Sequence, residues 1–387
     1  MVEMEKYKLG DICEIVSGST PKTNIDEYWE GTIKWITPAE LNDDTYIITD
    51  SVRKITELAV KKTGLKSFPE GTVILSSRAP IGKVAIAGCE MYCNQGFKNL
   101  ICSKKINNKY LYWFLKGNTV FLNSLGRGAT FKELSKSIVS NIEINLPDIV
   151  YQKKAVETLE KVSEIIALRK RELSSLDDLI KARFVEMFGT LDTPTQAFEK
   201  ATLKELCNKI TDGKHGGCKS EVGTERYFVG AREIYDDDVH YESAPEINIE
   251  EFEKDYKRCN VEIGDFLIVN TGATIGKSAI ACDKRTEHTL LQKSVALLKV
   301  KKDVLNPIFL KWCYRVNTKM YMVENASAQP NLLLSKINAT VIYVPDIELQ
   351  NQFADFVHQV DKSKVAIQKA LDKTQMLFDS LMKEYFG

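Results

Sequence analysis

The stretch Asn270–Ser278, which reads NTGATIGKS, has glycines and a lysine at a spacing that could cradle a phosphate group. A nucleotide-binding P-loop needs four residues between its first glycine and the Gly-Lys pair, so that successive backbone N–H groups surround the β-phosphate. Three residues separate Gly272 from Gly276, so this loop is one residue short. The flanking apolar runs favour a strand, a tight glycine turn and a second strand. A nucleotide-binding enzyme with a degenerate P-loop at 272–278 stays open as an alternative.

A second stretch, SSRAPIGKV at Ser76–Val84, repeats the pattern in a form even further from a P-loop. Arg78 stands where the first glycine would be, and Val84 takes the place of the Ser or Thr that binds magnesium. The simpler interpretation, a strand–turn–strand segment, fits both copies. It places Lys83 and Lys277 in equivalent turns. A lysine in such a turn can contact a backbone phosphate of DNA.

Both halves of the chain carry loops with cations, hydroxyls and amides, which are the groups that contact DNA. Lysine and arginine neutralise phosphates, and the amides of asparagine and glutamine can pair bidentately with adenine. A single loop cation is usually a solvated surface residue, and a single loop amide usually caps a turn, but the recurrence of such loops in both halves favours a shared role. The candidate DNA-binding residues are Thr20, Lys22, Thr37, Arg78, Lys83, Asn94, Gln95, Arg127, Lys132, Lys214, His215, Arg232, Asn270, Lys277, Gln292, Lys293, Gln329 and Asn331.

Motifs of common catalytic sites are missing from the sequence, which contains no HExxH, no GxSxG and no GxGxxG after a strand. Asn306–Phe309 reads NPIF and lacks the second proline of the [ND]PP[YF] motif of DNA amino-methyltransferases. Pro307 instead predicts the first turn of a helix. We therefore expect a non-catalytic chain that needs no cofactor.

Composition indicates an ordinary globular protein without net charge, because 53 Lys and Arg balance 53 Asp and Glu. This balance excludes a chain coated in basic residues but leaves room for local basic loops. Nine scattered cysteines without a CxxC pair, together with four histidines, argue against a metal site. The charged N-terminus and the lack of a long apolar run predict a cytoplasmic protein without a membrane segment.

An internal repeat with a period close to half the chain organises the sequence. KLGDICEIVSGSTP, starting at Lys8, matches TLKELCNKITDGKH, starting at Thr202; KYLYWFL matches IFLKWCY, and INLPDIVYQKKA matches IYVPDIELQNQF. The copies end in FVEMFG and MKEYFG. Each copy begins with short β-rich runs and helical patches, reaches Pro147 or Pro345, and then changes to helical periodicity. The chain therefore contains two tandem copies of one two-part unit.

The helical part of each copy has apolar residues at 4–3 spacing over more than four heptads, without glycine or proline. Such a pattern predicts a coiled-coil seam, and two such helices in one chain can pack on each other. The alternative is an amphipathic helix packed only on its own globular part. The candidate seam residues are Leu159, Val162, Ile166, Leu173, Leu176, Ile180, Val357, Val360, Ile367, Leu371, Phe378 and Leu381.

These patterns predict an α+β protein with two tandem globular domains of mixed α/β character, at 1–147 and 190–345. Each domain is followed by a long helix, at 148–189 and 346–387, and we expect the two helices to pair as an antiparallel coiled coil. Because a duplication relates the two units by a pseudo-twofold, the expected molecule is a spacer with two heads.

The order of the motifs resembles that of the specificity subunit of type I restriction–modification systems, over essentially the whole chain. The shared features are SGSTP near the N-terminus, a WIT strand end, GTVILSSRAPIGKVAI, an NQG segment, an LPDI…Q exit and a long helix. RAPIGK and the LP or VP…Q junction are the most specific of these. In the second copy TDGKHGG replaces the SGxTP form, and GATIGK lacks the arginine, which indicates a different DNA half-site.

The resemblance implies that two target-recognition domains each read one half of a bipartite, asymmetric DNA site. It also implies that the two helices set the spacing and dock two modification (methyltransferase) subunits. The implied partners are double-stranded DNA, these two subunits and, in some complexes, restriction subunits with helicase and nuclease activity. A coiled-coil adaptor whose heads bind proteins is the other alternative.

Overall fold

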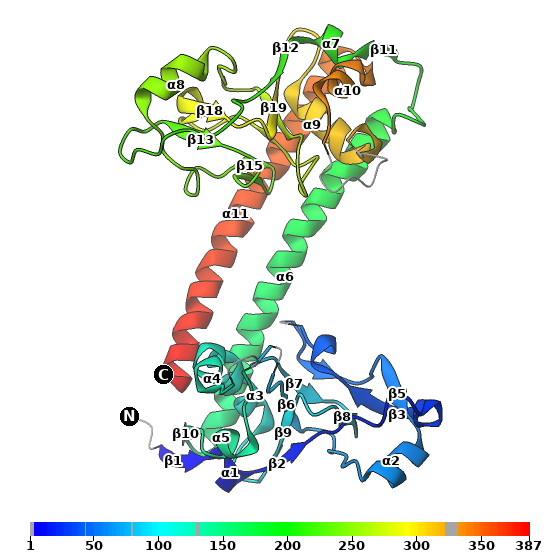
Figure 1. The fold of residues 1–387 in the computed structure, drawn as a ribbon, viewed down its shortest axis with the longest axis vertical. Coiled ribbons are helices and arrows are strands. Elements are labelled where there is room, and N and C mark those ends of the chain that lie inside the picture. The colour runs from blue at the N-terminus through cyan, green and yellow to red at the C-terminus, as the bar shows by residue number, and fades with distance from the viewer. Residues whose placement is uncertain (1–3, 43, 79, 129–131, 322–330) are drawn as a thin grey trace. The chain divides into compact units, whose positions relative to one another are not determined.

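The computed structural model describes residues 4–42, 44–78, 80–128, 132–321 and 331–387 (Figure 1). The chain forms two compact units: unit 1 is Met1–Lys170 with Lys369–Gly387, and unit 2 is Arg171–Gln368. Each unit contains one globular head, head 1 (residues 4–147) or head 2 (residues 190–345), and parts of two long helices. These helices, α6 (Ile149–Phe188) and α11 (Ile347–Phe386), have 40 residues each. None of the helices among the described residues has the length and hydropathy that crossing a membrane requires.

Head 1 is built on three small sheets. The largest has the order β2 (Cys13–Ser17), β9 (Lys98–Cys102), β6 (Val73–Leu75), β7 (Val84–Ala87) and β4 (Ile47–Ile48). A second sheet joins β5 (Arg53–Ile55), β3 (Trp29–Ile36) and β8 (Tyr92–Cys93), and β1 (Glu5–Lys8) pairs with β10 (Glu143–Leu146). The helices are α1 (Leu9–Ile12), α2 (Glu57–Thr63), α3 (Asn108–Gly117), α4 (Thr119–Leu125) and α5 (Lys136–Ser140).

Head 2 repeats this plan. Its main sheet has the order β12 (Cys207–Asp212), β19 (Val295–Val300), β16 (Phe266–Val269) and β17 (Ser278–Ile280). The paired strands are β13 (Tyr227–Val229) with β18 (Thr289–Leu291), β14 (Ile234–Tyr235) with β15 (Asp238–Val239), and β11 (Glu199–Thr202) with β20 (Val341–Val344). The helices are α7 (Leu203–Leu206), α8 (Ile249–Tyr256), α9 (Pro307–Val316) and α10 (Leu334–Ala339).

The strand orders confirm the internal repeat at the level of topology. The order β2-β9-β6-β7 in head 1 corresponds to β12-β19-β16-β17 in head 2. The parallel pair β3–β8 corresponds to β13–β18, and the antiparallel pair β1–β10 corresponds to β11–β20. The two heads can therefore be compared element by element, and differences between equivalent loops can be read directly.

The two GK-containing stretches are strand–turn–strand segments, as expected. β6 pairs with β7, and β16 pairs with β17, both antiparallel. Gly82 and Gly276 sit in the turns with φ values of 95° and 90°, a region that residues with a side chain rarely adopt. A P-loop leads from a strand into a helix, so that the helix N-terminus faces the phosphates. Because a strand follows each turn here, the P-loop alternative is wrong.

A buried glutamine makes the same three contacts at both head–helix junctions. In unit 1, Gln152 on α6 accepts a hydrogen bond from Asn107 N at 2.8 Å and donates to Lys105 O at 3.1 Å and Pro147 O at 2.8 Å. In unit 2, Gln350 on α11 accepts from Asn306 N at 2.8 Å and donates to Val304 O at 2.9 Å and Pro345 O at 2.7 Å. Both glutamines are completely buried, so each holds together a strand end, a loop and two helices.

The start of α6 and the end of α11 run antiparallel in unit 1. Tyr151, near the start of α6, contacts Tyr385, near the end of α11, with 6.0 Å between ring centroids. One heptad after Val162, Arg169 donates to Ala370 O and to the hydroxyl of Thr374. The apolar side of α11 also packs on head 1, because Trp113 of α3 lies 5.6 Å from Phe378.

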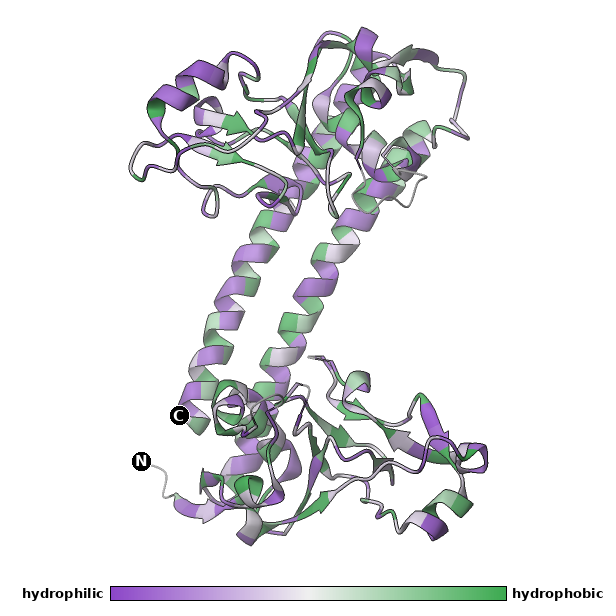
Figure 2. Ribbon diagram, in the orientation of Figure 1, coloured by the Kyte–Doolittle hydropathy of each residue, from purple (hydrophilic) through white to green (hydrophobic). Residues whose placement is uncertain are grey.

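Unit 2 pairs the other ends of the helices in the same sense. The ring centroid of Phe188, the last residue of α6, lies 5.7 Å from that of Phe353 near the start of α11. Asp177 of α6 forms an ion pair with Lys364 of α11, with 2.5 Å between the carboxylate oxygen and the ammonium nitrogen. Phe184 is buried between Phe188, Phe353 and Phe309 of α9. Figure 2 shows hydrophobic residues alternating with hydrophilic ones along both helices.

All twelve predicted seam residues are buried or half-buried in the structure. The buried ones are Leu159, Val162, Ile166, Ile180, Val357, Val360 and Leu371, and the half-buried ones are Leu173, Leu176, Ile367, Phe378 and Leu381. The members near the helix ends belong to the cores of the two heads, where α3 and α9 cover them. The helices are therefore anchored in the heads at both ends as well as facing each other.

Candidate nucleic-acid interface

Loops of head 1 meet where β2, β3, β6 and β8 end, and backbone hydrogen bonds hold them together. Ser19 N donates to Cys93 O at 3.0 Å, and Asn94 N donates to Ile36 O at 3.1 Å. Ser77 N donates to Gly96 O at 2.7 Å, and Leu134 N donates to Ser77 O at 2.9 Å. We call this set of joined loops the loop platform of head 1: residues 18–22, 37, 76–78, 94–96, 127–128 and 132–134.

Head 2 forms an equivalent loop platform with the same four backbone hydrogen bonds. The bonds run from Lys214 N to Leu291 O (2.7 Å), Gln292 N to Val229 O (2.8 Å), Asn270 N to Ser294 O (3.0 Å) and Leu332 N to Asn270 O (2.7 Å). This platform comprises residues 213–216, 230–232, 270–272, 292–294 and 331–332. Because the backbone frame is the same, Asn94 and Gln292 occupy equivalent positions, and so do Gln95 and Lys293.

One glycine in each platform is required by the close approach of two loops, and neither glycine is among the residues predicted from the sequence. A Cβ on Gly18 would lie 2.2 Å from Asn94 O, and a Cβ on Gly213 would lie 2.1 Å from Leu291 O. Contacts below 3.0 Å are not seen for real Cβ atoms, so a side chain at either position would push the loops apart. The signal was present in the sequence, because SGS and DGK place a glycine at the same point of each copy.

The predicted polar residues of head 1 divide into exposed ones and ones that organise the loops. Lys22 and Gln95 are exposed, and Gln95 accepts a hydrogen bond from the Thr20 hydroxyl at 2.5 Å. Asn94 caps its own turn by accepting from Gly96 N at 2.9 Å. Thr37 is half-buried, and it begins a short helical turn through a capping box with Glu40. The structure places these residues in one region of head 1, where Thr37 and Asn94 shape the loops rather than extend from them.

The carboxylate of Glu133 forms ion pairs with two cations of head 1, Arg78 and Lys98. Arg78 lies 3.8 Å from it and Lys98 lies 3.3 Å from it, while its backbone pairs with that of Arg127. The side chains of Arg127 and Lys132 are exposed and form no ion pair within the described residues. Arg78 is thus partly neutralised in the free protein, whereas Arg127 and Lys132 are free to meet a phosphate.

The sequence predicted that the Lys83 side chain projects from its turn towards DNA, but in the structure this side chain folds back onto the protein. Its ammonium donates to Pro38 O at 3.2 Å and to Leu41 O at 2.5 Å, two backbone carbonyls that it ties to the β6–β7 turn. The side chain is half-buried, and a lysine that already satisfies buried carbonyls is not available to a phosphate. The expectation that Lys83 projects towards DNA is therefore corrected. Lys277, at the equivalent turn of head 2, is exposed.

A shallow, open pocket of about 390 Å³ lies in the platform of head 2. Its lining is polar throughout: Lys214, Gly216, Thr271, Gln292, Lys293, Ser294 and Asn331. Four of these residues were predicted from sequence, whereas Thr271 and Ser294 were not. Thr271 donates to the Asn331 amide oxygen at 3.3 Å, and the Ser294 hydroxyl accepts from Ala231 N at 3.1 Å. The structure thus brings together residues from four separate loops.

Acidic residues on α8 balance part of the positive charge in head 2. Lys214 lies 2.7 Å from Asp255 and 3.5 Å from Glu251, and the hydrogen bond to Asp255 raises the pKa of Lys214 above its ordinary value. His215 approaches Asp212 at 3.4 Å, and Asp212 also pairs with Arg258 at 2.5 Å. Of the predicted cations of head 2, Arg232, Lys277 and Lys293 form no ion pair within the described residues, and all three are exposed.

Two further predicted residues of head 2 take other places. Asn270 is buried, 4% exposed, and its backbone joins the platform through Ser294 and Leu332, so it organises the loops instead of reaching a ligand. Gln329 lies outside the described residues. Among the described residues, no group of three His, Cys, Asp or Glu side chains is arranged to hold a metal ion. What both platforms offer is charge and hydrogen-bonding capacity on a fixed backbone.

Comparison with known proteins agrees with this arrangement. The family model for the type I restriction modification DNA specificity domain matches residues 1–177 and again residues 196–374. The type I restriction enzyme MjaIX specificity subunit of Methanocaldococcus jannaschii is 41% identical, with 98% of this chain and 92% of that protein covered. The EcoprrI specificity subunit of Escherichia coli is 23% identical over 93% of this chain and 88% of its own length.

Solved structures share the fold at low sequence identity. The S subunit of a type I restriction-modification system from M. genitalium superposes with a TM-score of 0.57 at 14% identity, covering 100% of this chain and 96% of its own. A chain from a study of complex assembly and conformational transition of the type I R-M system gives a TM-score of 0.60 at 16% identity, covering 99% and 97%. The chain belongs to the family of type I restriction modification DNA specificity domains and carries two copies of that domain.

Proposed function

We propose that this chain is the DNA-reading specificity subunit of a type I restriction–modification complex and that its two heads read the two halves of a bipartite site. The observation that carries the proposal is the duplicated loop platform, in which four identical backbone hydrogen bonds hold different side chains in head 1 and head 2. A fixed backbone with different side chains suits two readers of two different half-sites. The relatives that match the chain over most of their length are themselves named specificity subunits.

Phosphate contacts in this proposal come from the predicted cations that are exposed and form no ion pair within the described part of the chain. These are Lys22, Arg127 and Lys132 in head 1, and Arg232, Lys277 and Lys293 in head 2. Such contacts position a protein on DNA, whereas contacts to base edges carry the specificity. The amides of Gln95, Gln292 and Asn331 have the hydrogen-bonding pattern that pairs with adenine. Since Arg78 is held by Glu133, its release to a base or phosphate would require that pair to open.

Modification subunits are the proposed protein partners, with restriction subunits joining in the complete enzyme. Support comes from the relatives' names and from the two helices, whose seam residues are covered while many of the residues between them are exposed. The chain itself is proposed to be non-catalytic, and the chemistry to reside in the partners. The proposed compartment is the cytoplasm, where the DNA is.

The experiment for this proposal is methylation mapping with exchanged heads. The chain is produced with its modification subunits, and the methylated motif is read from the DNA of the host. Replacement of head 1 by the corresponding head of another family member should change one half of the motif and leave the other half and the spacing unchanged. A change in both halves, or in neither, would rule out the two-reader arrangement.

A lysine pair provides a sharper test of the platform. Lys293→Ala should weaken binding to all sequences and lower the salt dependence of the binding constant by about one unit of slope, as expected for one lost phosphate contact. The matched control is Lys204→Ala, because Lys204 is also exposed but lies on α7, next to the start of β12, whereas the platform lies at its end. Equal effects of the two substitutions would show that the platform is not where DNA binds.

A further inference from the structure

Two free cysteines of head 1 face each other across β2 and β9. These strands pair antiparallel, and Cys13 lies opposite Cys102 in their register. Just outside the pair, Ser103 N donates to Ile12 O at 2.9 Å. Cys13 N donates to Leu9 O, so the two cysteines form a non-hydrogen-bonded pair. In such a pair the Cα atoms are about 4.5 Å apart, which is within the range of about 4.4–6.8 Å that a disulfide spans.

The side chains of this pair lie on the same face of the sheet. Opposite residues of an antiparallel pair have Cβ atoms about 4.5–5.5 Å apart, and a disulfide needs about 3.5–4.5 Å, so a small approach at the end of the ladder suffices. Cys13 belongs to the core of head 1, and Cys102 packs against that core. Interaction with the Cys102 thiol, together with burial, raises the pKa of the Cys13 thiol above its ordinary value. The backbone register and the side-chain placement therefore both bring the two sulfur atoms together.

The two thiols differ in their access to a small oxidant. Cys102 is the last residue of β9 and is half-buried. It lines an open pocket of about 340 Å³ together with Gly71, Thr72 and Lys104, among others. Cys13 is only 7% exposed. An accessible cysteine beside a second, sheltered cysteine is the arrangement in which the first is oxidised and the second resolves it.

Head 2 has the same ladder with one thiol at the equivalent point. Cys207 of β12 lies opposite Val300 of β19, as Cys13 lies opposite Cys102. Cys207 is buried, and burial raises its pKa to about 12. The residue opposite Cys207 therefore has no sulfur to offer, and head 2 provides an internal control for the chemistry of head 1.

We propose that Cys102 is a site of oxidative modification and that Cys13 resolves it by forming a disulfide across the β2–β9 ladder. The co-reactant is hydrogen peroxide. Its O–O bond breaks as the Cys102 sulfur takes one oxygen, which gives a sulfenic acid and one molecule of water. The Cys13 sulfur then attacks the Cys102 sulfur, and the hydroxyl group leaves with the Cys13 proton as a second molecule of water. The two thiols lose two electrons in total, and the peroxide gains them.

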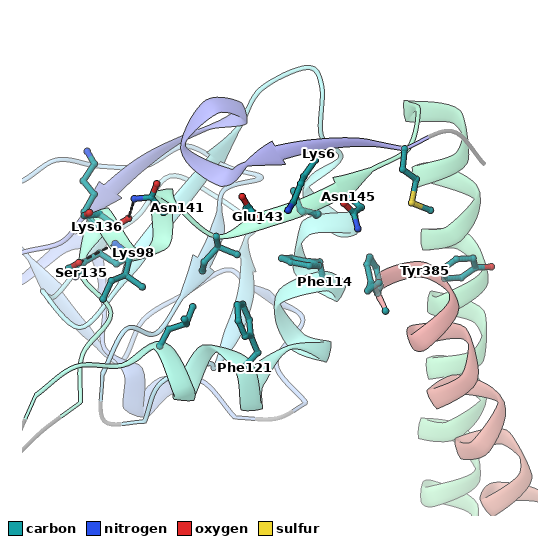
Figure 3. A pocket seen from close by; sticks show the side chains of 18 of the residues that line it. Lys6, Lys98, Phe114, Phe121, Ser135, Lys136, Asn141, Glu143, Asn145 and Tyr385 are labelled. Atoms are coloured by element: carbon teal, nitrogen blue, oxygen red, sulfur yellow. Dashed lines mark hydrogen bonds and ion pairs between the residues drawn. The ribbon is translucent and has the colours of Figure 1, made fainter. Parts of the chain in front are cut away.

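The disulfide lies at the end of the ladder that is remote from the loop platform. At the other end, Ser17 lies opposite Lys98, whose ammonium pairs with Glu133 of the platform at 3.3 Å. Lys98 also lines a separate pocket of about 1120 Å³, which Figure 3 shows. A bond between Cys13 and Cys102 closes a long loop of the unfolded chain, so it stabilises head 1 without altering a platform residue. The proposal does not depend on what the platform binds.

The test is treatment of the full chain with hydrogen peroxide, followed by blocking of free thiols and peptide mapping without reduction. The peptides that contain Cys13 and Cys102 should appear linked, and dithiothreitol should separate them. The melting transition of unit 1 should rise by about 4–16 °C, as expected for a cross-link of typical strength in a unit of this size. The transition of unit 2 should stay where it is, because Cys207 faces a valine.

Matched variants separate the two cysteines. Cys102→Val gives head 1 the Cys–Val pair of head 2, so it should fold and lose both the linked peptides and the rise in melting temperature. In Cys13→Ala, Cys102 should still be oxidised and remain a sulfenic acid that dimedone labels. Cys282 is exposed, and its oxidation reports an effective dose of peroxide. The proposal is overturned if Cys13 and Cys102 stay free thiols at that dose, if dimedone does not label Cys13→Ala at Cys102, or if the linked chain melts at the temperature of the reduced one.

Discussion

Replacement of Gln152 by leucine tests whether the buried glutamine holds the head–helix junction of unit 1. The substitution keeps the volume and removes three hydrogen bonds, those with Asn107 N, Lys105 O and Pro147 O. A typical hydrogen bond contributes about 1 kcal/mol net, and a buried group left unpaired costs about 1–3 kcal/mol. Three such groups give an expected loss of roughly 3–9 kcal/mol in the free energy of unfolding of unit 1. For a unit of this size that is a fall in the melting temperature of about 6–36 °C.

Hydrogen exchange with mass spectrometry is the suitable assay, because it resolves the two units in one experiment. Peptides from residues 100–117 should lose protection in Gln152→Leu, including the amide of Asn107, while peptides from unit 2 keep theirs. Gln350→Leu is the matched control, since Gln350 makes the equivalent three contacts in unit 2. It should produce the mirror result, with protection lost around residues 300–316.

A second variant checks the cause of the loss. In Gln152→Glu the carboxylate can still accept from Asn107 N but faces two carbonyl oxygens, so burial and repulsion should raise its pKa. A raised carboxyl pKa means that the stability is recovered below the unfolded-state pKa and lost as the pH rises through the folded-state pKa. If Gln152→Leu melts within about 1 °C of the parent chain, or if Gln152→Glu shows no recovery at low pH, the hydrogen bonds do not stabilise the junction and the reasoning fails.

Three further outcomes are expected. Lys83→Ala should lower the stability of unit 1 by about 1–3 kcal/mol, since Pro38 O and Leu41 O lose their donor, without changing the salt dependence of DNA binding; a changed salt slope in binding titrations would restore the phosphate role. Arg285 lowers the pKa of Asp283 to about 2, so this carboxylate stabilises unit 2 above about pH 4 and its contribution disappears as the pH falls through 2. Thermal melts of Asp283→Asn between pH 2 and 7 should therefore converge with the parent chain at the acid end, and a constant difference would contradict this. Addition of one heptad to both α6 and α11 should lengthen the preferred gap between half-sites by about 10 Å, or roughly three base pairs; selection from a library of spacer lengths would show it, and recovery of the parent spacer at full affinity would exclude a measuring role for the helices.

Sequence reasoning succeeded where local chemistry decides the structure. The helix bounds of 148–189 and 346–387 were expected, and the observed helices are 149–188 and 347–386. A proline followed by aspartate marks each start, a glycine marks each end, and neither Gly nor Pro interrupts the run. The strand–turn–strand form of the two GK stretches followed for the same reason, because apolar runs and a glycine turn are short-range signals.

The site was harder to predict because its side chains are placed by residues far away in the sequence. Lys83 donates hydrogen bonds to two backbone carbonyls about forty residues earlier in the sequence, so it does not extend from the platform. Lys214 forms ion pairs with Glu251 and Asp255 of α8. No local pattern distinguishes these lysines from Lys277 and Lys293, which stay exposed. Thr271 and Ser294 were missed because a lone hydroxyl in a loop carries no signal until folding places it beside Asn331 or Ala231.

The backbone frame of the loop platforms has an evolutionary consequence. Its four hydrogen bonds join main-chain atoms only, and its tightest contacts involve glycines, so the side chains that extend from it contribute little to its stability. Mutations at such positions change the stability of the fold very little. Selection therefore acts on them only through their effect on ligand binding. The duplicated copies already display this freedom, with Gln95 in one head and Lys293 at the equivalent position of the other, on the same frame. A lineage that carries this fold can therefore drift through many loop sequences without passing through unfolded intermediates.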